Sequence, residues 1–316
     1  MQDFYKELRN FKPEEIKEFS KWVTSFTKLK TKPFNFDKHE YQKTILDDTH
    51  PTIGVRKCVQ VGVSEILIRK FLAFMAMHQG CQGIYTFPTA AEVSQFVKAR
   101  VDPVIKGCSK IKELGFNTDN VKVKQIGQSF VHFKGSFGER ETIAVPSDYN
   151  IHDEIDYSKP DIQNLYRSRL EHSSFRWETN CSTPSIPSYG IDQIFEDSDQ
   201  RHWHIKCPHC NMWQILTWLP DKDKIDTNNI ADPNGNPIYV DKENIKEIEL
   251  IYVCRKCRKK LEYRSDLEME WVAKYTNKDI HGYHLGPCVA WGYKKPNRII
   301  KSFYDYKEID KAYNHV

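Results

Sequence analysis

The sequence predicts an α/β fold in which a mostly parallel sheet is flanked by helices and carries an inserted metal-binding module. Three observations indicate this class. Between residues 52 and 185, strand-like and helix-like patterns alternate, as expected for a parallel sheet covered by helices. A string that resembles a phosphate-binding loop follows the first strand, from Lys57 to Ser64. Two Cys-x-x-Cys pairs lie in the second half, at spacings typical of a zinc site.

The composition is compatible with a globular protein that has a substantial core. The chain has 316 residues, of which 39% are hydrophobic, so it can form two domains or one large domain with an insertion. Its net charge of +4 is too small to indicate a nucleic-acid partner by itself. Between residues 255 and 301, however, there are twelve Lys/Arg and only five Asp/Glu. This excess suits a polyanion, and a solvated surface is the alternative.

The sequence gives no sign of export or of a membrane segment. The first seven residues are mostly polar, and the longest apolar run, 71–77, is far too short to span a bilayer. The nine cysteines are odd in number and follow no export signal, which argues against a disulfide framework. We therefore expect a soluble protein of a reducing cytosol.

Each element is predicted from its own periodicity and flanking residues. Apolar positions at helical spacing predict a first helix that Pro33 terminates, and β-branched or alternating runs predict the strands. In chain order the expected elements are helix 14–30, strand 52–55, helix 65–78, strand 83–87, helix 90–104, a hairpin of 121–125 with 130–133, strand 142–145, helix 161–172 and strand 282–285. The expected organisation is a helical, adenine-side segment (1–50), an ATPase core (51–200), a zinc-ribbon-like insertion (201–275), and a return to the core with the start of a linker (276–316).

The loop after the first strand carries the main functional signal. The usual pattern is G-x-x-x-x-G-K-[ST], and here Gly62 and Ser64 hold its second glycine and its hydroxyl. Val63 takes the lysine position, whereas Lys57 stands where the first glycine belongs. Strand, loop and helix follow in the order that places anions at a helix N-terminus. The predicted ATP ligands are Lys57, Gln60, Val61, Gly62, Val63, Ser64 and Glu65. The alternative is a chance match to a short motif.

Asp153 and Glu154 are the predicted catalytic carboxylates. In P-loop ATPases of the ASCE type, which use a catalytic glutamate, a strand ends in such a pair. Asp153 would then hold Mg²⁺ together with Ser64, and Glu154 would polarise the attacking water. Because the strand before the pair is short and polar, a solvated surface pair is the alternative.

Further candidates surround this predicted site. Ser182 and Thr183, just before a proline, can sense the γ-phosphate, or they form a plain turn. Arg140 is the candidate catalytic arginine, in cis or from a neighbouring subunit, with Arg100 as its rival and a surface role as the alternative for both. Upstream, Tyr41-Gln42 could stack on adenine and read its edge, or it is a pair on a helix surface.

Four cysteines are predicted to bind a structural zinc ion. Cys207 and Cys210 form one knuckle, and Cys254 and Cys257 form the other. Four thiolates satisfy the tetrahedral preference of Zn²⁺ and leave no position open for substrate. A redox dithiol is the alternative, but it would need only one pair. The remaining cysteines are interpreted as small buried hydrophobic residues.

Taken together, these motifs resemble the large terminase subunit of lambda-like tailed phages. The resemblance rests on the displaced lysine of the loop, the pair Asp153-Glu154, the Ser182-Thr183-Pro184 segment and the Cys-Pro-His-Cys knuckle at 207–210 that follows it. It covers roughly residues 36 to 316. It implies an ATPase that uses ATP and Mg²⁺ to pump double-stranded viral DNA into a procapsid, in the host cytoplasm.

The resemblance also implies partners and roles. Members of the family work as a homo-oligomeric ring on a portal, with a small DNA-recognising subunit, although an isolated domain can be a monomer. Lys57, Gly62 and Ser64 would bind phosphates. Ser182 and Thr183 would couple hydrolysis to movement, and Arg140 would be a trans-acting finger. Gln60 stands where some relatives have arginine, so a cis-arginine at that position is unsupported.

Full-length members of the family continue into a metal-dependent nuclease domain, and this sequence ends about where that domain should begin. We therefore expect an isolated motor domain, an engineered fragment, without DNA cleavage activity. Two other functions stay open from the sequence: another P-loop DNA motor such as a helicase, and a non-enzymatic zinc-ribbon protein that binds DNA.

Overall fold

The computed structural model describes residues 19–117, 120–138 and 145–305 of the chain. Within these ranges the centre of the molecule is an 11-stranded sheet with the order β11-β10-β15-β3-β9-β8-β4-β7-β6-β5, and β14 also pairs with β10. The strands are β1 (Lys28–Leu29), β2 (Lys32–Pro33), β3 (Thr52–Lys57), β4 (Gln82–Phe87), β5 (Phe116–Asn117), β6 (Val123–Ile126), β7 (Ser129–Gly135), β8 (Tyr149–Asp153), β9 (Trp177–Ser182), β10 (Arg201–Lys206), β11 (Trp213–Gln214), β12 (Ile230–Ala231), β13 (Ile251–Tyr252), β14 (Met269–Val272) and β15 (His281–Leu285).

The centre of the sheet is parallel, as the sequence predicts. Strands β10, β15, β3, β9, β8, β4 and β7 pair in parallel along this order, whereas β5, β6, β11 and β14 pair antiparallel at its margins. Because parallel strands point the same way, the residues at the ends of β3, β8 and β9 meet at one edge. The mixed α/β class with a large, mostly parallel sheet is thereby confirmed.

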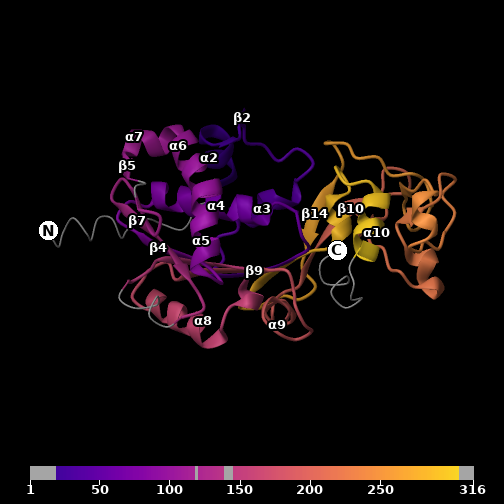
Figure 1. Cartoon of the computed structure of the whole chain (residues 1–316). Helices are drawn as coiled ribbons and strands as arrows, with labels where there is room; N and C mark the ends of the chain where they lie inside the picture. The colour runs from indigo at the N-terminus through magenta and orange to yellow at the C-terminus, as the bar shows by residue number, and fades with distance from the viewer. Residues whose placement is uncertain (1–18, 118–119, 139–144, 306–316) are drawn as a thin grey trace.

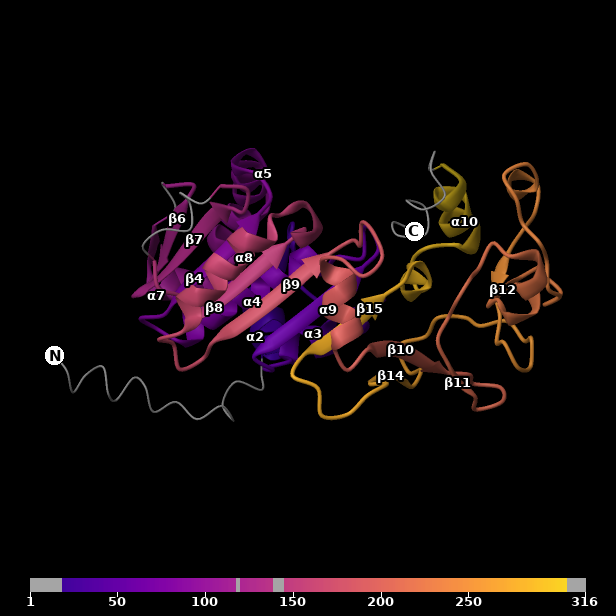
Figure 2. The same cartoon turned by 90° about the horizontal axis from the view of Figure 1, so that it is seen from below.

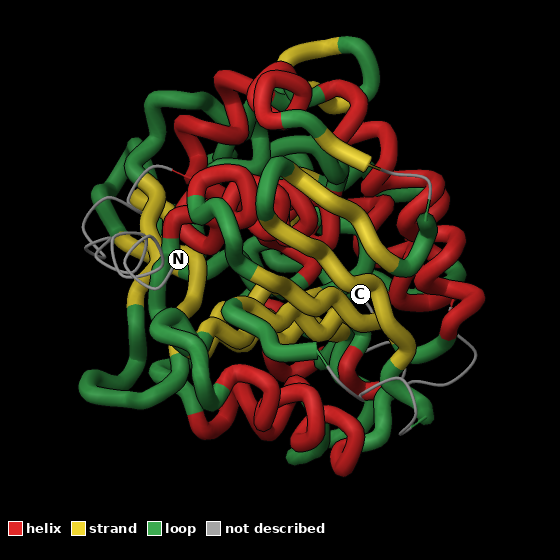
Figure 3. The backbone as a smooth tube through the Cα atoms, turned by 90° about the vertical axis from the view of Figure 1, so that its left-hand side faces the viewer, coloured by secondary structure: helices red, strands yellow, loops and turns green. Residues whose placement is uncertain are grey.

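Helices cover both faces of the sheet (Figures 1 and 3). They are α2 (Phe19–Phe26), α3 (Tyr41–Asp47), α4 (Val63–Met77), α5 (Ala90–Phe96), α6 (Asp102–Gly107), α7 (Ser109–Leu114), α8 (Pro160–Arg167), α9 (Ile191–Asp197) and α10 (Pro296–Asp305). Helices α2 and α4 lie on one side of the sheet, and α8 and α9 lie on the other. Helix α4 is buried along almost its whole length, because it lies between the sheet and α2. No described helix has the length and hydropathy needed to cross a membrane.

Several elements differ from their sequence-based expectations. The described part of the first helix runs from Phe19 and ends at Phe26, and the β1–β2 hairpin follows where a helix to residue 30 was expected. Arg69 of α4 donates to the carbonyl of Lys28 at 2.8 Å, which holds this segment extended. The helix expected at 90–104 is interrupted by a π-helical turn, Val97–Val101. Of the strand expected at 142–145, residues 142–144 lie outside the described residues.

Beyond β10 the chain builds a second core. Trp218, Tyr252, Trp291 and Phe303 pack there with Ile205, Leu216 and other residues of the segments that flank the cysteines. This module occupies the end of the molecule opposite α7 (Figures 1 and 2). It is continuous with the main sheet, because β10 pairs with β15 and β15 pairs with β3.

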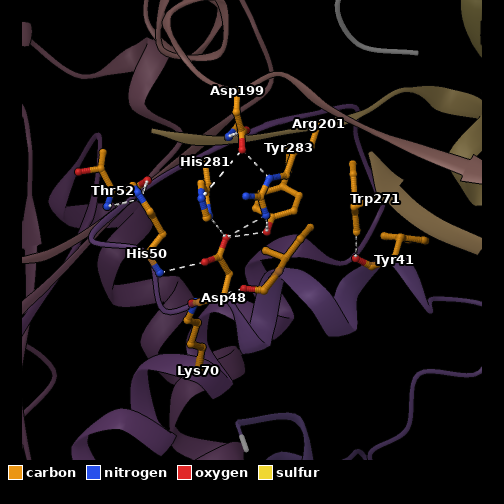
Figure 4. Close-up of polar contacts among 12 residues, drawn as sticks. Tyr41, Asp48, His50, Thr52, Lys70, Asp199, Arg201, Trp271, His281 and Tyr283 are labelled. Atoms are coloured by element: carbon orange, nitrogen blue, oxygen red, sulfur yellow. Dashed lines mark hydrogen bonds and ion pairs between the residues drawn. The ribbon is translucent and has the colours of Figure 1, made fainter. Parts of the chain in front are cut away.

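A partly buried polar cluster ties the start of β10 and β15 to the segment after α3 (Figure 4). The Asp48 carboxylate accepts hydrogen bonds from His281 Nδ1 at 2.8 Å and from the Tyr283 hydroxyl at 2.6 Å. Arg201 Nη1 lies 3.6 Å from the same carboxylate. Burial alone would raise the pKa of Asp48, but His281, Lys70 and Tyr283 together hold it below its usual value. The cluster therefore fixes the module-bearing strands to the core through an ionised carboxylate.

Candidate functional site

The loop between β3 and α4 has the backbone shape that its sequence suggests. Gln60 and Gly62 both have positive φ, 59° and 74°. A Cβ at Gly62 would lie 2.6 Å from Gln42 Nε2, so the left-handed φ favours glycine there and a larger residue would displace the Gln42 amide. The loop ends at Gly62, the N-cap of the 15-residue helix α4. The N–H groups of the first turn of α4 are therefore available to an anion.

Tyr41 and Gln42 hold this loop in place. The Tyr41 hydroxyl and Gln42 Nε2 each donate to the Val61 carbonyl at 2.9 Å. Both side chains are almost completely buried. Trp271 Nε1 of β14 donates to the Tyr41 carbonyl at 2.9 Å, which links β14 to helix α3 (Figure 4). Tyr41 and Gln42 thus fix the loop through the Val61 carbonyl.

Lys57 contacts the predicted catalytic glutamate. Its Nζ lies 2.8 Å from Glu154 Oε1, although 97 residues separate the two in sequence. The Lys57 side chain is 8% exposed and that of Glu154 is 31% exposed, so the glutamate is the more accessible of the two. Burial opposes the charge of Lys57, but its neighbours, Cys181, Glu154 and Asp153, raise its pKa above the ordinary value. Lys57 is therefore a charged group beside the loop, on the N-terminal side of Gly62.

The carboxylate of Asp153, the candidate metal ligand, is held among buried polar groups. The carboxylate is fully buried, and its Oδ2 accepts a hydrogen bond from the Tyr85 hydroxyl at 2.9 Å. Its Oδ1 has no hydrogen-bond partner among the described residues. Burial raises the pKa of Asp153, while Lys57 and the hydroxyls of Ser64 and Tyr85 act to lower it. A buried carboxylate oxygen without a partner, next to a serine hydroxyl, is a donor set that fits Mg²⁺.

Ser182 joins the same group at the end of β9, which lies between β3 and β8. Its hydroxyl is 3.3 Å from Glu154 Oε2 and 3.0 Å from the carbonyl of Thr183. The main-chain N–H of Asp156 donates to the same hydroxyl at 3.4 Å. Ser182 thus connects Glu154 with the segment that follows β9.

The four predicted zinc ligands come together as expected from their spacing. The sulfurs of Cys207, Cys210, Cys254 and Cys257 all lie within 4.8 Å of one another. The Cys207–Cys257 and Cys210–Cys254 sulfur pairs are 3.8 and 3.6 Å apart. Tetrahedral zinc with Zn–S bonds of about 2.3 Å requires sulfurs about 3.8 Å apart. The arrangement fits a zinc ion bound by four thiolates.

Comparison with known proteins identifies the family. Residues 28–271 match the model of the phage terminase large subunit gpA, ATPase domain. The chain belongs to this family. The ATPase domain of the large terminase from Thermus phage P74-26 has a similar fold, with a TM-score of 0.53 at 12% identity over 91% of this chain and 94% of that one. The large terminase of bacteriophage HK97 aligns with a TM-score of 0.49 at 12% identity, over 58% of this chain and 40% of that one. The chain thus matches less than half the length of the HK97 protein. No curated protein matches it.

The two candidate catalytic arginines of this terminase ATPase domain are Arg140 and Arg100. Arg140 lies outside the described residues. Arg100 stands on the π-helical turn, 52% exposed, and its Nη1 donates to Glu65 Oε2 at 2.9 Å. Since Glu65 follows Ser64 directly, Arg100 lies beside the first turn of α4.

Sequence reasoning missed Tyr85, the partner of Asp153. Tyr85 lies in the middle of β4, in a run that reads only as a buried strand. Its ring packs against Phe71, Phe87 and Phe96. The available signal was a short run that favours a buried strand, which indicates burial but not the carboxylate 68 positions away.

Proposed function

We propose that this chain is the ATP-hydrolysing motor domain of a large terminase, which drives double-stranded viral DNA into a procapsid. Membership of the terminase ATPase family supports the proposal. The observation that carries it is the 2.8 Å contact between Lys57 and Glu154 beside the N-terminus of α4. It brings the displaced lysine and the acidic pair to one edge of the sheet.

Phosphate binding rests on three parts of the chain. The loop and the first turn of α4 offer main-chain N–H groups, as in other phosphate loops. Lys57 adds a positive charge from the N-terminal side of the loop. Ser64 and Asp153 would hold Mg²⁺, which would neutralise charge on the outer phosphates. Contact between adenine and Tyr41 or Gln42 would require these buried side chains to leave the Val61 carbonyl.

Glu154 is the proposed general base. It would orient the water and accept its proton as the water oxygen attacks the γ-phosphorus and the bond to the bridging oxygen of ADP breaks. In this structure Glu154 is paired with Lys57. Phosphates that engage Lys57 compete with this pair, so ATP binding would free Glu154 to face the water. Ser182 and Thr183 would pass this change to the segment after β9.

The oligomeric state and the partners are proposed from the family. We propose a homo-oligomeric ring on the portal, with a small subunit that selects the DNA, working in the host cytoplasm. Arg140 is the proposed trans-acting finger, with Arg100 as the alternative in the same subunit. The zinc ion has four thiolate ligands and no open position, so its proposed role is structural.

Steady-state ATP turnover by the zinc-loaded chain tests the proposal. Glu154→Gln keeps the size of the side chain and removes its basicity, so turnover should fall about 100-fold or more while ATP still binds. Lys57→Ala should weaken ATP binding as well. A forked DNA substrate should remain paired, because a packaging motor moves an intact duplex. Turnover unchanged by both substitutions, or strand separation on the fork, would contradict the proposal.

A further inference from the structure

A polar groove runs beside the zinc site, on the module at the far end of the sheet. It has a volume of about 740 Å³ and lies between the tip of the first knuckle, the turn at Pro233–Gly235 and the chain that follows the second knuckle. Its lining includes His209, Arg258, Lys259, Lys260 and Arg264. Nothing in the proposed ATPase chemistry uses it.

The chain that forms this groove is strongly basic. Between residues 254 and 264 there are six Lys/Arg and a single carboxylate, Glu262. Part of this charge offsets the thiolates and holds the module together. Arg258 donates to the carbonyls of Gly235 and Asn228 at 3.0 and 2.9 Å, and Arg255 donates to the carbonyl of Ile215 at 3.1 Å. These two arginines are structural.

The lysines are available to a ligand. Lys256 and Lys259 are exposed and form no ion pair with any described residue. Lys260 pairs with Glu262 at 2.6 Å, but both side chains are more than half exposed, and such surface pairs are weak and readily exchanged. Within the groove an incoming phosphate therefore meets the ammonium groups of Lys259 and Lys260, and it has only one weak surface ion pair to displace.

We infer that this groove binds the sugar–phosphate backbone of duplex DNA, without reading its sequence. The inference rests on the proposed function for the identity of the polyanion. The groove is lined mainly by lysine, arginine, proline, glycine and asparagine, and His209, Ile251, Cys257 and Glu262 complete the lining. No Phe, Tyr or Trp, on which single strands stack, is among these described residues. Charged side chains without base-stacking partners position a backbone and specify no sequence. A motor that moves along any sequence needs a contact of this kind.

The experiment measures the affinity of the zinc-loaded chain for a fluorescein-labelled 30-base-pair duplex, by anisotropy at several salt concentrations. The test variant is Lys259→Glu with Lys260→Glu. The matched control is Lys106→Glu with Lys112→Glu, which makes the same charge change on exposed residues of α6 and α7, at the opposite end of the molecule (Figure 1). Loss of two phosphate contacts should weaken binding roughly 60-fold at 0.1 M salt and reduce the salt slope by about 2. Zinc content and DNA-free ATP turnover should stay at wild-type values.

Equal affinity and slope in test and control variants would overturn the inference and leave the ATPase proposal intact. If poly-glutamate or duplex RNA displaces the labelled duplex as effectively as unlabelled duplex DNA does, the assignment to DNA is overturned. If the double reversal fails to retain zinc, Lys259→Gln with Lys260→Gln gives the same comparison with half the charge change. Absence of ATP turnover in the wild-type chain would instead contradict the proposed function, whichever way the DNA measurements fall.

Discussion

Substitution of Tyr85 by phenylalanine should weaken the binding of Mg²⁺ by Asp153 more than it destabilises the fold. The change removes one hydroxyl and leaves the ring, which packs among Phe71, Phe87 and Phe96, so it creates almost no cavity. The hydroxyl donates to Asp153 Oδ2 at 2.9 Å, and both groups are fully buried. Loss of a hydrogen bond to a buried carboxylate costs about 1–3 kcal/mol.

Only part of this free energy should appear as lost stability. Without the phenol, Asp153 loses one of the groups that lower its already raised pKa, so the carboxylate is less readily ionised and less well oriented for a metal. Loss of a partner behind a metal ligand typically weakens metal binding about 10- to 100-fold. The Mg²⁺ concentration that gives half-maximal ATP turnover should rise by that factor, while turnover at saturating Mg²⁺ recovers much of the wild-type value.

Tyr149→Phe is the matched control. Tyr149 is equally buried, and its hydroxyl bonds the Thr179 hydroxyl at 3.0 Å, away from the acidic pair. We expect it to lower the free energy of urea unfolding by about 1 kcal/mol and to leave the Mg²⁺ dependence unchanged. If Tyr85→Phe shows the Mg²⁺ dependence of the wild type, the assignment of Asp153 as a metal ligand held by Tyr85 is refuted.

Three further outcomes are expected. Gly62→Ala should destabilise the fold by roughly 1–2 kcal/mol and weaken ATP binding, because φ is 74° and the new Cβ would meet Gln42; unchanged urea unfolding and ATP affinity would contradict this. Zinc removal by a chelator, or Cys254→Ser, should unfold the second core while the main sheet persists, which near-ultraviolet circular dichroism and zinc analysis can follow. The pKa of Asp48 lies below its unfolded value of 3.8, so its stabilisation is complete above that pH and is lost as the pH falls through the lower folded pKa. Asp48→Asn should therefore lower stability at pH 7 by roughly 1–3 kcal/mol and flatten the acid branch of the pH–stability curve; an unaltered acid branch would argue against the role of the buried His281–Asp48 pair.

The functional edge of the sheet was largely predictable because its signals are local. The loop needs glycine at one position and a strand and a helix on either side, and all of these are adjacent in sequence. The knuckles are similar, since two cysteines three positions apart already define half of a tetrahedral site. These patterns reflect backbone geometry and ligand chemistry, which do not depend on the rest of the fold.

The parts that sequence missed depend on distant contacts. The segment 28–33 reads as the end of a helix, but Arg69 holds it extended through the carbonyl of Lys28. The strand that ends at Asp153 reads as polar and short, yet β8 is completely buried, because β4 and β9 flank its edges and helices cover both faces of the sheet. Local propensity carries no information on such neighbours.

The central claim is that Lys57, at the N-terminal side of the loop, binds the phosphates of ATP. A crystal structure of the zinc-loaded chain with Mg²⁺ and a non-hydrolysable ATP analogue tests it most directly. We expect Lys57 Nζ within about 3 Å of an oxygen of the β- or γ-phosphate, with Glu154 released from the lysine. Phosphates bound elsewhere, or bound at the loop while Lys57 remains paired with Glu154, would contradict the central claim.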